Sequence, residues 1–194
     1  MSVPGAIIGT AGGSLNAGSA GWAANADVAR VGQRGEQRTA RILNALALQP
    51  GGPTVLHDLR IPIPGFSANI DHAVISGNDV TLLDSKSWKP GFYWTLGTTR
   101  RGLARFPFAD KRTLPTAVSA IAKHLQRAGV SAHLRQSLLV IWPSSPNGST
   151  ALWAYHPQSA VAVTGDAFER CAARRVGTRS ADPRVVAALR SLVH

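Results

Sequence analysis

Several kinds of residue are scarce in this sequence of 194 amino acids, and each scarcity excludes a class of protein or site. The only cysteine is Cys171, which excludes an internal disulfide and a cysteine-rich zinc site and favours a reducing compartment. The first 26 residues contain no charged side chain, no basic segment and no continuous apolar run. We therefore expect no signal peptide and no membrane span in this segment, and we expect a cytoplasmic location.

Chain length and composition also bound the domain organisation. Residues 1–26 are rich in Gly, Ala and Ser, which is typical of a flexible leader. Residues 27–194 are enough for one well-buried core but too few for two ordinary domains and a linker. We therefore expect a leader followed by a single domain.

Acidic residues are scarce as well, because 10 Asp and Glu stand against 21 Lys and Arg and give a formal net charge of +11. Such an excess favours a polyanionic partner such as nucleic acid, although charge alone equally allows a ribosomal or membrane-surface role. With so few acids in the chain, an acidic residue inside an apolar segment is a candidate for a specific role. Two of them, Asp71 and Asp84, lie in the segment IDHAVISGNDVTLLDSKSW, residues 70–88.

Hydrophobic periodicity predicts an alternation of helices and strands. Residues 30–48 have helical spacing, and one stripe of this helix carries Glu36, Thr39, Ala40, Leu43 and Leu46. Strands are predicted at residues 54–65, 68–76, 79–87, 92–106 (as a hairpin with a basic tip), 137–143, 151–156 and 160–164. Further helices are predicted at residues 113–129, 166–175 and 182–193, with Asp166 and Asp182 as the caps of the last two. This order indicates an α/β fold with a central mixed β-sheet flanked by helices.

Two of the predicted strands are expected to form a β-hairpin around a Gly-Asn pair at 77–78, which suits the positive φ angles of a tight turn. A turn there places Asp71 directly opposite Asp84. Since side chains alternate along a strand, both carboxylates and Lys86 share one face of the sheet. Like charges directly opposite each other destabilise a sheet unless something neutralises them, and a divalent cation would do so.

The side chains on this face suit a site for Mg²⁺ or Mn²⁺. Mg²⁺ takes hard oxygen ligands, often one or two protein carboxylates, with water and substrate phosphate completing its shell. Glu36 is a third acid, on the inward stripe of a helix expected to cover the same face. Lys86 is suited to hold the attacking water or to neutralise charge in the transition state. The alternative interpretation is two solvated acids paired with nearby Lys or Arg.

Four segments carry a further signal: GQRGEQRTARIL, VLHDLRIP, ANIDHAVIS and LLDSKSWKPG. In this order and spacing, over residues 31–91, they resemble the nuclease-related domain (NERD) family, a branch of the PD-(D/E)xK restriction-endonuclease-like superfamily. The resemblance implies a restriction-endonuclease-like core and Mg²⁺-dependent hydrolysis of phosphodiester bonds. It also implies that Asp71 is the first acidic motif, Asp84 and Lys86 the (D/E)xK pair, and Glu36 the helical acid.

Candidate contacts to nucleic acid lie in and after the (D/E)xK strand. Arg100, Arg101 and Arg105 are suited to gripping phosphates, and Trp88 is suited to stacking on an unpaired base. The alternatives are a solvated turn and ordinary aromatic packing. His72 lies on the opposite face from the acids, so we expect a packed or hydrogen-bonded histidine there rather than a catalytic base.

Two hypotheses about function remain. The first is a Mg²⁺-dependent deoxyribonuclease. The second is a nuclease fold that binds nucleic acid but cuts weakly or not at all, within a DNA-processing or plasmid-transfer complex. It is motivated by a departure from the family, whose members usually have an NP-x-x-Q element on the helix after the sheet. The comparable place here reads TLPTAVSAIAKHL, with Val118 at the position expected for Gln and with Lys123 and Gln126 as candidates to replace it.

Overall fold

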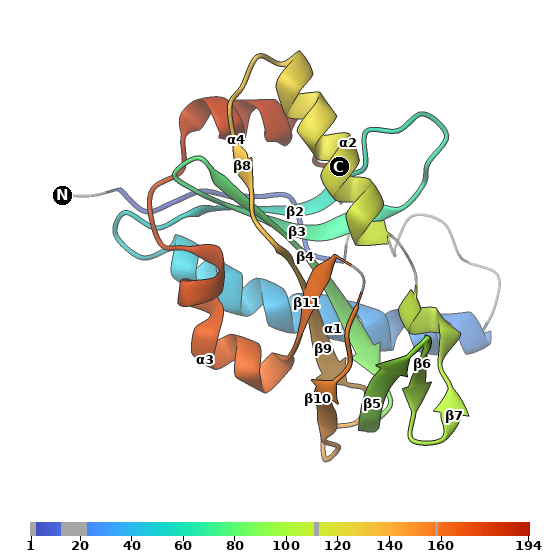
Figure 1. The fold of residues 1–194 in the computed structure, drawn as a ribbon. Coiled ribbons are helices and arrows are strands. Elements are labelled where there is room, and N and C mark those ends of the chain that lie inside the picture. The colour runs from blue at the N-terminus through green and yellow to red at the C-terminus, as the bar shows by residue number, and fades with distance from the viewer. Residues whose placement is uncertain (1–2, 13–22, 111–112, 158) are drawn as a thin grey trace.

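The computed structural model describes residues 3–12, 23–110, 113–157 and 159–194 (Figure 1). The strands of the main sheet are β1 (Ile7–Ile8), β2 (Thr54–Arg60), β3 (Asn69–Ser76), β4 (Asp79–Trp88), β8 (His133–Leu134), β9 (Ser137–Pro143) and β11 (Ala160–Thr164). They follow the order β1-β2-β3-β4-β9-β11, and β8 also pairs with β4. β2, β3 and β4 pair antiparallel, whereas β4, β9 and β11 pair in parallel. The predicted mixed α/β fold is therefore confirmed.

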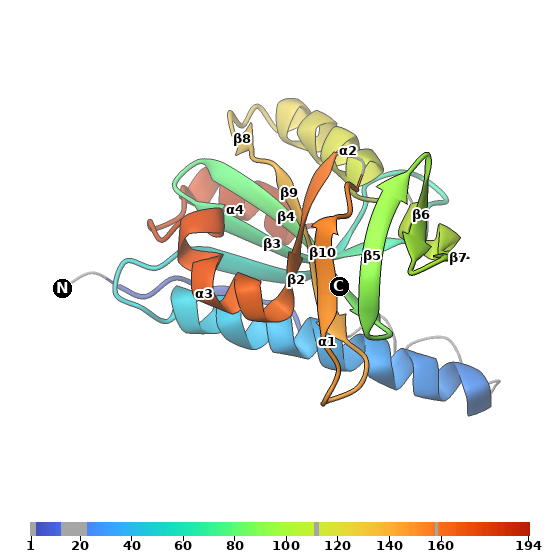
Figure 2. The same ribbon diagram turned by 60° about the horizontal axis from the view of Figure 1, so that its bottom comes forward.

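A smaller sheet and the helices complete the described part of the chain. The smaller sheet has the order β10-β5-β6-β7, with bounds β5 (Gly91–Leu96), β6 (Thr98–Arg101), β7 (Ala104–Arg105) and β10 (Thr150–Ala154). The helices are α1 (Ala23–Ala47), the 3-10 helix η2 (Pro107–Asp110), α2 (Thr113–Arg127), α3 (Gly165–Val176) and α4 (Pro183–Arg190). Figure 2 shows the smaller sheet beside the carboxyl end of β4.

The two faces of the main sheet build two separate hydrophobic clusters. Leu82 of β4 belongs to one cluster with Ile121 of α2, whereas the next residue, Leu83, belongs to the other with Leu43 of α1 and Phe168 of α3. Successive residues of a strand point to opposite faces, so α1 and α3 cover one face and α2 covers the other. α4 lies on the same side as α2 (Figure 1).

The hairpin between β3 and β4 has the predicted turn. Gly77 adopts a φ of 63°, a left-handed conformation that suits glycine, and Ser76 stands opposite Asp79. The register continues to His72 opposite Leu83, as the position of the turn predicts. Because one face of these strands is buried under α1 and the other under α2, a slip of one residue would invert every contact.

The starts of α3 and α4 test the predicted caps. Thr164, not Asp166, caps α3, and its Oγ1 accepts a hydrogen bond from the backbone N–H of Ala167 at 3.3 Å. Asp166 lies in the first turn instead, where a carboxylate still favours the positive end of the helix dipole. Asp182 caps α4 as predicted, accepting from the N–H of Arg184 at 2.8 Å.

The hairpin between β5 and β6 forms as predicted, but its tip is not basic. The turn centres on Gly97, whose φ is 71°, and it joins Leu96 to Thr98. Arg100 and Arg101 lie towards the far end of β6, and Arg105 lies in β7. The three arginines instead flank the next turn, at Gly102-Leu103, where Arg100 stands opposite Arg105 and Arg101 opposite Ala104. The predicted basic tip therefore belongs to the hairpin of β6 and β7, because Gly97 closes the first hairpin before the arginines.

The segment expected as a leader, 1–26, is only partly described, since residues 1–2 and 13–22 lie outside the described residues. Within it, Ile7 and Ile8 form β1, which pairs in parallel with β2. α1 begins at Ala23, several residues before the helix predicted from the sequence. Among the described residues, no helix is both long enough and apolar enough to cross a membrane.

A pair of glycine substitutions tests this packing. A Cβ on Gly165 would lie 2.0 Å from the ring of Trp142, which is only 3% exposed. Gly165→Ala is therefore expected to lower the free energy of unfolding by about 1–3 kcal/mol. Gly32 lies inside α1 with no heavy atom within 4 Å of the same position, so Gly32→Ala is expected to raise that free energy by about 0.5–1 kcal/mol. Urea unfolding measures both, and equal stability of Gly165→Ala and the wild type would contradict the packing described.

Candidate functional site

The candidate site begins where β3 parts from β4. The backbone pairing of these strands ends at His72 and Leu83, one residue short of Asp71 and Asp84. There the carboxylate of Asp71 accepts a hydrogen bond from the backbone N–H of Ser85 at 2.6 Å. On its other side β4 remains paired with β9, where Asp84 stands opposite Leu139. The side chain of Asp71 thus replaces a strand carbonyl as the partner of the Ser85 N–H, and one of its oxygens is held in place.

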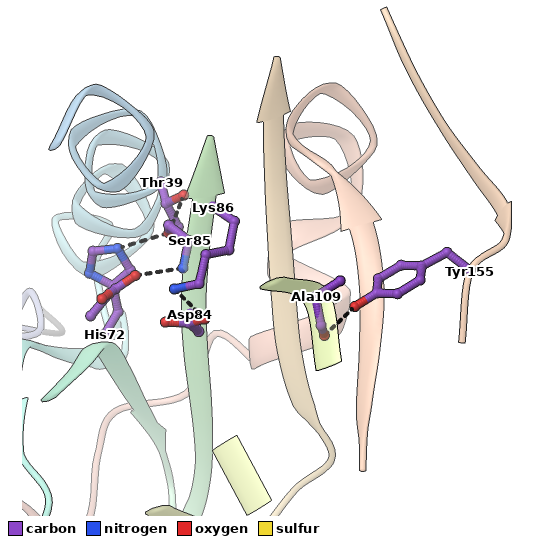
Figure 3. A network of polar contacts seen from close by, with 8 residues as sticks. Thr39, His72, Asp84, Ser85, Lys86, Ala109 and Tyr155 are labelled. Atoms are coloured by element: carbon purple, nitrogen blue, oxygen red, sulfur yellow. Dashed lines mark hydrogen bonds and ion pairs between the residues drawn. The ribbon is translucent and has the colours of Figure 1, made fainter. Parts of the chain in front are cut away.

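Ser85 also connects this point to α1. Its hydroxyl donates to Oγ1 of Thr39 at 2.9 Å (Figure 3). Trp142 donates to the same Thr39 oxygen at 2.9 Å through Nε1. Thr39 in turn donates to the carbonyl of Gly35, 3.2 Å away. Ser85, Thr39 and Trp142 are all buried, so water does not compete for the hydrogen bonds between them. The network fixes the turn of α1 that carries Glu36.

Asp84 and Lys86 form an ion pair on the α2 face of the sheet. The Nζ atom of Lys86 lies 2.6 Å from Oδ2 of Asp84 (Figure 3). The Asp84 side chain is 8% exposed, whereas the Lys86 side chain is 40% exposed, so the lysine is the partner that solvent reaches. Both side chains share the face of Leu82, as the alternation along the strand predicts.

Glu36 reaches the site from the other face. The sequence predicts that its helix covers the face of the two aspartates, and this prediction is wrong, because Leu43 of α1 packs with Leu83 on the opposite face. Glu36 nevertheless lines the same cavity as Asp71 and Asp84. The parting of β3 and β4 accounts for this arrangement, since a continuous pair of strands would separate a residue of α1 from the α2 face.

The cavity that contains these groups has a volume of about 590 Å³. It brings together all four residues expected to be catalytic, which are Glu36, Asp71, Asp84 and Lys86. Further polar residues border it that the sequence did not single out as site residues: Ser67, Asn69, Thr95, Thr113 and His156. The far wall includes Ala109, whose carbonyl accepts a hydrogen bond from the Tyr155 hydroxyl at 3.3 Å (Figure 3). His156 and Thr113 lack a recognisable signal because separate loops and helices bring them to the cavity.

The acids of the site repel one another. The pKa of Glu36 is raised from 4.5 to about 7, first by burial and then by Asp84 and Asp58, against the opposing effect of Lys86. The pKa of Asp71 is raised well above its ordinary value by burial and by Asp84. Burial alone lowers the pKa of Lys86, but Asp84 and Asp71 outweigh it and raise that pKa, so the lysine stays charged. One lysine thus faces three carboxyl groups, and the cavity favours additional positive charge.

The donor set fits a hard divalent cation that keeps part of its water shell. Carboxylate oxygens are the ligands that Mg²⁺ prefers, and one or two of them commonly suffice when water and phosphate supply the rest. Within the described ranges, no three acidic, histidine or cysteine side chains are gathered closely enough to hold a metal ion on their own. The residues therefore fit a cation shared with a substrate better than a closed structural site.

His72 is a buried, hydrogen-bonded residue on the α1 face, as predicted. Its Nδ1 lies 2.8 Å from Nδ1 of His57, and both rings are about 1% exposed or less. The other side of His57 contacts the Asn44 side-chain oxygen at 2.9 Å. A bond between two Nδ1 atoms needs one donor and one neutral acceptor, so the pair is stable only when at least one ring is uncharged. Burial lowers the pKa of His57 from 6.5 to about 4.

The residues expected to contact nucleic acid are arranged differently from the catalytic four. None of the three arginines lines the cavity. Arg101 donates twice to the carbonyl of Pro90, at 3.1 and 2.9 Å, and Arg100 donates to the carbonyl of Leu103 at 3.0 Å, while Arg105 is exposed. Trp88 borders the cavity but is 7% exposed, and its ring packs against the rings of Tyr93, Phe106 and Tyr155. Trp88 is thus a core residue, the alternative that the sequence left open.

α2 contributes few polar side chains to the cavity. Its residues there are Thr113, Leu114 and Pro115, from the first turn. Val118 is half-buried and packs against the core, whereas Lys123 and Gln126 are exposed and lie outside the cavity. Neither of them takes the place of the glutamine that family members usually have.

Comparison with known proteins identifies one family. The model of the family described as "NERD: Nuclease-related domain" matches residues 31–141, which is more than half of the chain. No curated protein matches the chain, and no solved structure matches it. The matched range includes all four residues that meet in the cavity, whereas His156 lies beyond it.

The histidine pair predicts an acid-sensitive fold. Because the folded-state pKa of His57 is below its unfolded value of 6.5, the unfolded chain binds a proton first, and stability falls as pH drops from 6.5 towards about 4. The loss from this residue is on the order of 3 kcal/mol. We expect His57→Gln to lessen this pH dependence in urea unfolding, while His72, whose pKa is also lowered by burial, keeps part of it. The control His194→Gln, at an exposed position, is expected to leave it unchanged. An identical slope in the wild type and His57→Gln would show that His57 does not control it.

Proposed function

Since the chain belongs to the nuclease-related domain family, we propose that it is a metal-dependent nuclease that hydrolyses phosphodiester bonds of DNA. The observation that carries the proposal is the cavity in which Glu36, Asp71 and Asp84 meet Lys86. Family membership supports a nuclease-related function and contact with nucleic acid. The metal dependence, the choice of DNA and the roles of individual residues are the further content of the proposal.

Asp71 and Asp84 are the proposed direct metal ligands, and Glu36 is proposed to complete the shell, either directly or through a bound water. Asp71 has one oxygen occupied by the Ser85 N–H and the other left to face the cavity, and Asp84 is oriented by Lys86. Burial raises the pKa values of Asp71 and Glu36 first, and the neighbouring carboxylates raise them further. Both effects support this role, because a cation would favour the charged carboxylates. A bound Mg²⁺ or Mn²⁺ would supply charge neutralisation and a more acidic water at the scissile phosphate.

Lys86 is proposed to act on the reacting groups directly. Its charge is kept by Asp84, and its side chain is the part of the ion pair that solvent reaches. From there its ammonium group can orient the attacking water or donate to a phosphate oxygen that gains negative charge. In the reaction a water oxygen bonds to phosphorus and loses its proton to solvent or to a carboxylate. The bond from phosphorus to the leaving oxygen breaks, and that oxygen takes a proton from solvent to become a hydroxyl group.

A DNA substrate is supported by charge. The chain carries a formal net charge of +11, which favours a polyphosphate partner. Arg105 is exposed on β7 of the smaller sheet, and we propose that it contacts the phosphate backbone outside the cavity. Arg100 and Arg101 are proposed to hold the backbone around Arg105 in place. Arg100 donates to the carbonyl of Leu103, next to β7, and Arg101 donates to the carbonyl of Pro90, just before β5.

The second candidate function is a nucleic-acid-binding module with weak or no cleavage. One observation favours it: the part of α2 that borders the cavity offers only Thr113 as a polar side chain, and the glutamine usual in the family is absent. Such a protein would bind DNA in a salt-dependent way without metal-stimulated cutting.

Cleavage assays with site variants separate the two functions. We expect the wild type to cut plasmid or single-stranded DNA with Mg²⁺ or Mn²⁺ but not with chelator. Asp84→Ala and Lys86→Ala are each expected to lower the cleavage rate by at least about a hundredfold, because each removes a group that acts on the transition state. Lys89→Ala, which removes an exposed lysine outside the cavity, is the matched control. Undiminished cutting by both site variants, with folding confirmed by urea unfolding, would refute the assignment.

The contribution of Arg105 is tested by binding rather than by cleavage. The logarithm of the DNA association constant is expected to fall linearly with the logarithm of the salt concentration. Arg105→Ala is expected to reduce that slope by about 1, as loss of a phosphate contact does. Arg170→Ala removes an exposed charge on α3 and serves as the control. An unchanged slope for Arg105→Ala, measured by fluorescence anisotropy in metal-free buffer, would exclude the contact.

A further inference from the structure

A second cavity lies where the segment before β9 meets the carboxyl end of α3. Its volume is about 380 Å³, and it is lined by Arg135, Gln136, Leu138, Arg174 and Arg175. The two arginines of α3 come from its last turn. Two segments that are far apart in the sequence therefore bring three guanidinium groups to one concave surface.

This cavity is distinct from the candidate active site. Leu138 lines the second cavity, whereas Leu139, the next residue of β9, lines the cavity of Asp71 and Asp84. Successive strand residues point to opposite faces, so the two cavities lie on opposite faces of the sheet. The second cavity is therefore a separate site from the one proposed for cleavage.

The second cavity has positive charge without a negative partner among the residues that the structure describes. No acidic residue lines it. The ion pairs recorded among the described residues include Arg179 with Asp79 and Arg184 with Asp182, and none of them involves the three arginines of the cavity. Like charges that converge on one concave surface repel one another, and an anion between them removes that repulsion.

Arg175 has a buried donor that the described residues do not satisfy. Its Nε atom is shielded from solvent and has no hydrogen-bond partner among them. Buried donors nearly always have a partner in folded proteins, and an unpaired one indicates a missing ligand, ion or water. The Arg175 side chain lines the cavity, and a rotation of its guanidinium group towards a ligand there would give Nε an acceptor.

The helix dipole alone does not explain this arrangement. Cationic side chains in the last turn of a helix offset the partial negative charge of its carbonyl end, which accounts for Arg174 and Arg175 being on α3. It does not account for Arg135, which approaches from a different segment, or for Gln136 beside it. Gly177, which caps the end of α3, packs so closely against Ser76 that a Cβ on Gly177 would lie 2.4 Å from the serine oxygen. This close packing fixes the position of the last turn of α3.

From the three guanidinium groups and the unsatisfied donor, we infer that this cavity is a binding site for a phosphate group. Planar guanidinium groups match the oxygens of phosphate with paired hydrogen bonds, and Gln136 adds an amide donor of the kind that contacts phosphate. The phosphate belongs either to a nucleic-acid backbone or to a small free phosphate compound. Both sources present the same chemistry to the arginines.

Calorimetry in metal-free Tris buffer at constant ionic strength tests the site. One arm titrates inorganic phosphate, and the other titrates a short DNA duplex without terminal phosphates. Arg174→Ala and Arg135→Ala are each expected to weaken binding of at least one of them about tenfold, as loss of a charged hydrogen bond does. Arg170→Ala removes the same charge from an exposed position of α3 outside the cavity, and its effect is expected to stay within about twofold.

The two arms identify the source of the phosphate. Weaker binding of inorganic phosphate by both cavity variants supports a site for a free phosphate compound. Weaker binding of the duplex alone supports a contact to nucleic acid. If neither variant differs from Arg170→Ala in either arm, or if the wild type binds neither titrant, the inference is overturned. Urea unfolding of both variants confirms that they remain folded, and cleavage activity plays no part in either result.

Discussion

The hydrogen bond from the Ser85 N–H to Asp71 is the interaction on which the candidate site depends. It occurs where the backbone pairing of β3 and β4 has ended, so the side chain of Asp71 takes the place of a strand carbonyl. One carboxylate oxygen is thereby oriented, and the sheet is opened just beyond it. This opening lets Glu36 enter a cavity on the α2 face although its helix packs on the other face.

The polar network behind this opening keeps the two faces in register. Ser85 contributes its backbone to Asp71 and its hydroxyl to Thr39, so one residue links the strand acid to α1. Trp142 of β9 binds the same threonine oxygen and thereby ties α1 to a third element. The arrangement buries carboxyl groups close to one another with one lysine to offset them. Burial first, and then mutual repulsion, raise the pKa values of Asp71 and Glu36. A cation at this place both relieves the repulsion and provides the chemistry that we propose.

Much of the fold, and the choice of Asp71 and Asp84 as neighbouring acids, could be predicted from local sequence. A Gly-Asn turn and strict alternation set the register of β3 and β4, and that register decides that Asp71, Asp84 and Lys86 share a face. Local sequence does not determine on which side of the sheet α1 packs, and the prediction that α1 covers the face of the two aspartates is wrong. Glu36 nevertheless reaches the cavity. The arginines flank the turn between β6 and β7 rather than the turn between β5 and β6, because Gly97 and Gly102 each allow a tight turn and divide the predicted hairpin into two. His156 and Thr113 went unnoticed because only the folded chain brings their segments to the acids.

The central claim is that Asp71 and Asp84, with Glu36 beside them, hold a divalent cation. Crystals soaked in Mn²⁺ and measured at the manganese absorption edge test it most directly. The account predicts an anomalous peak in contact with the carboxylates of Asp71 and Asp84, with Glu36 or a water bound to Glu36 completing the shell. Anomalous density that is confined to other acids, while the ion pair between Lys86 and Asp84 stays closed, would contradict it.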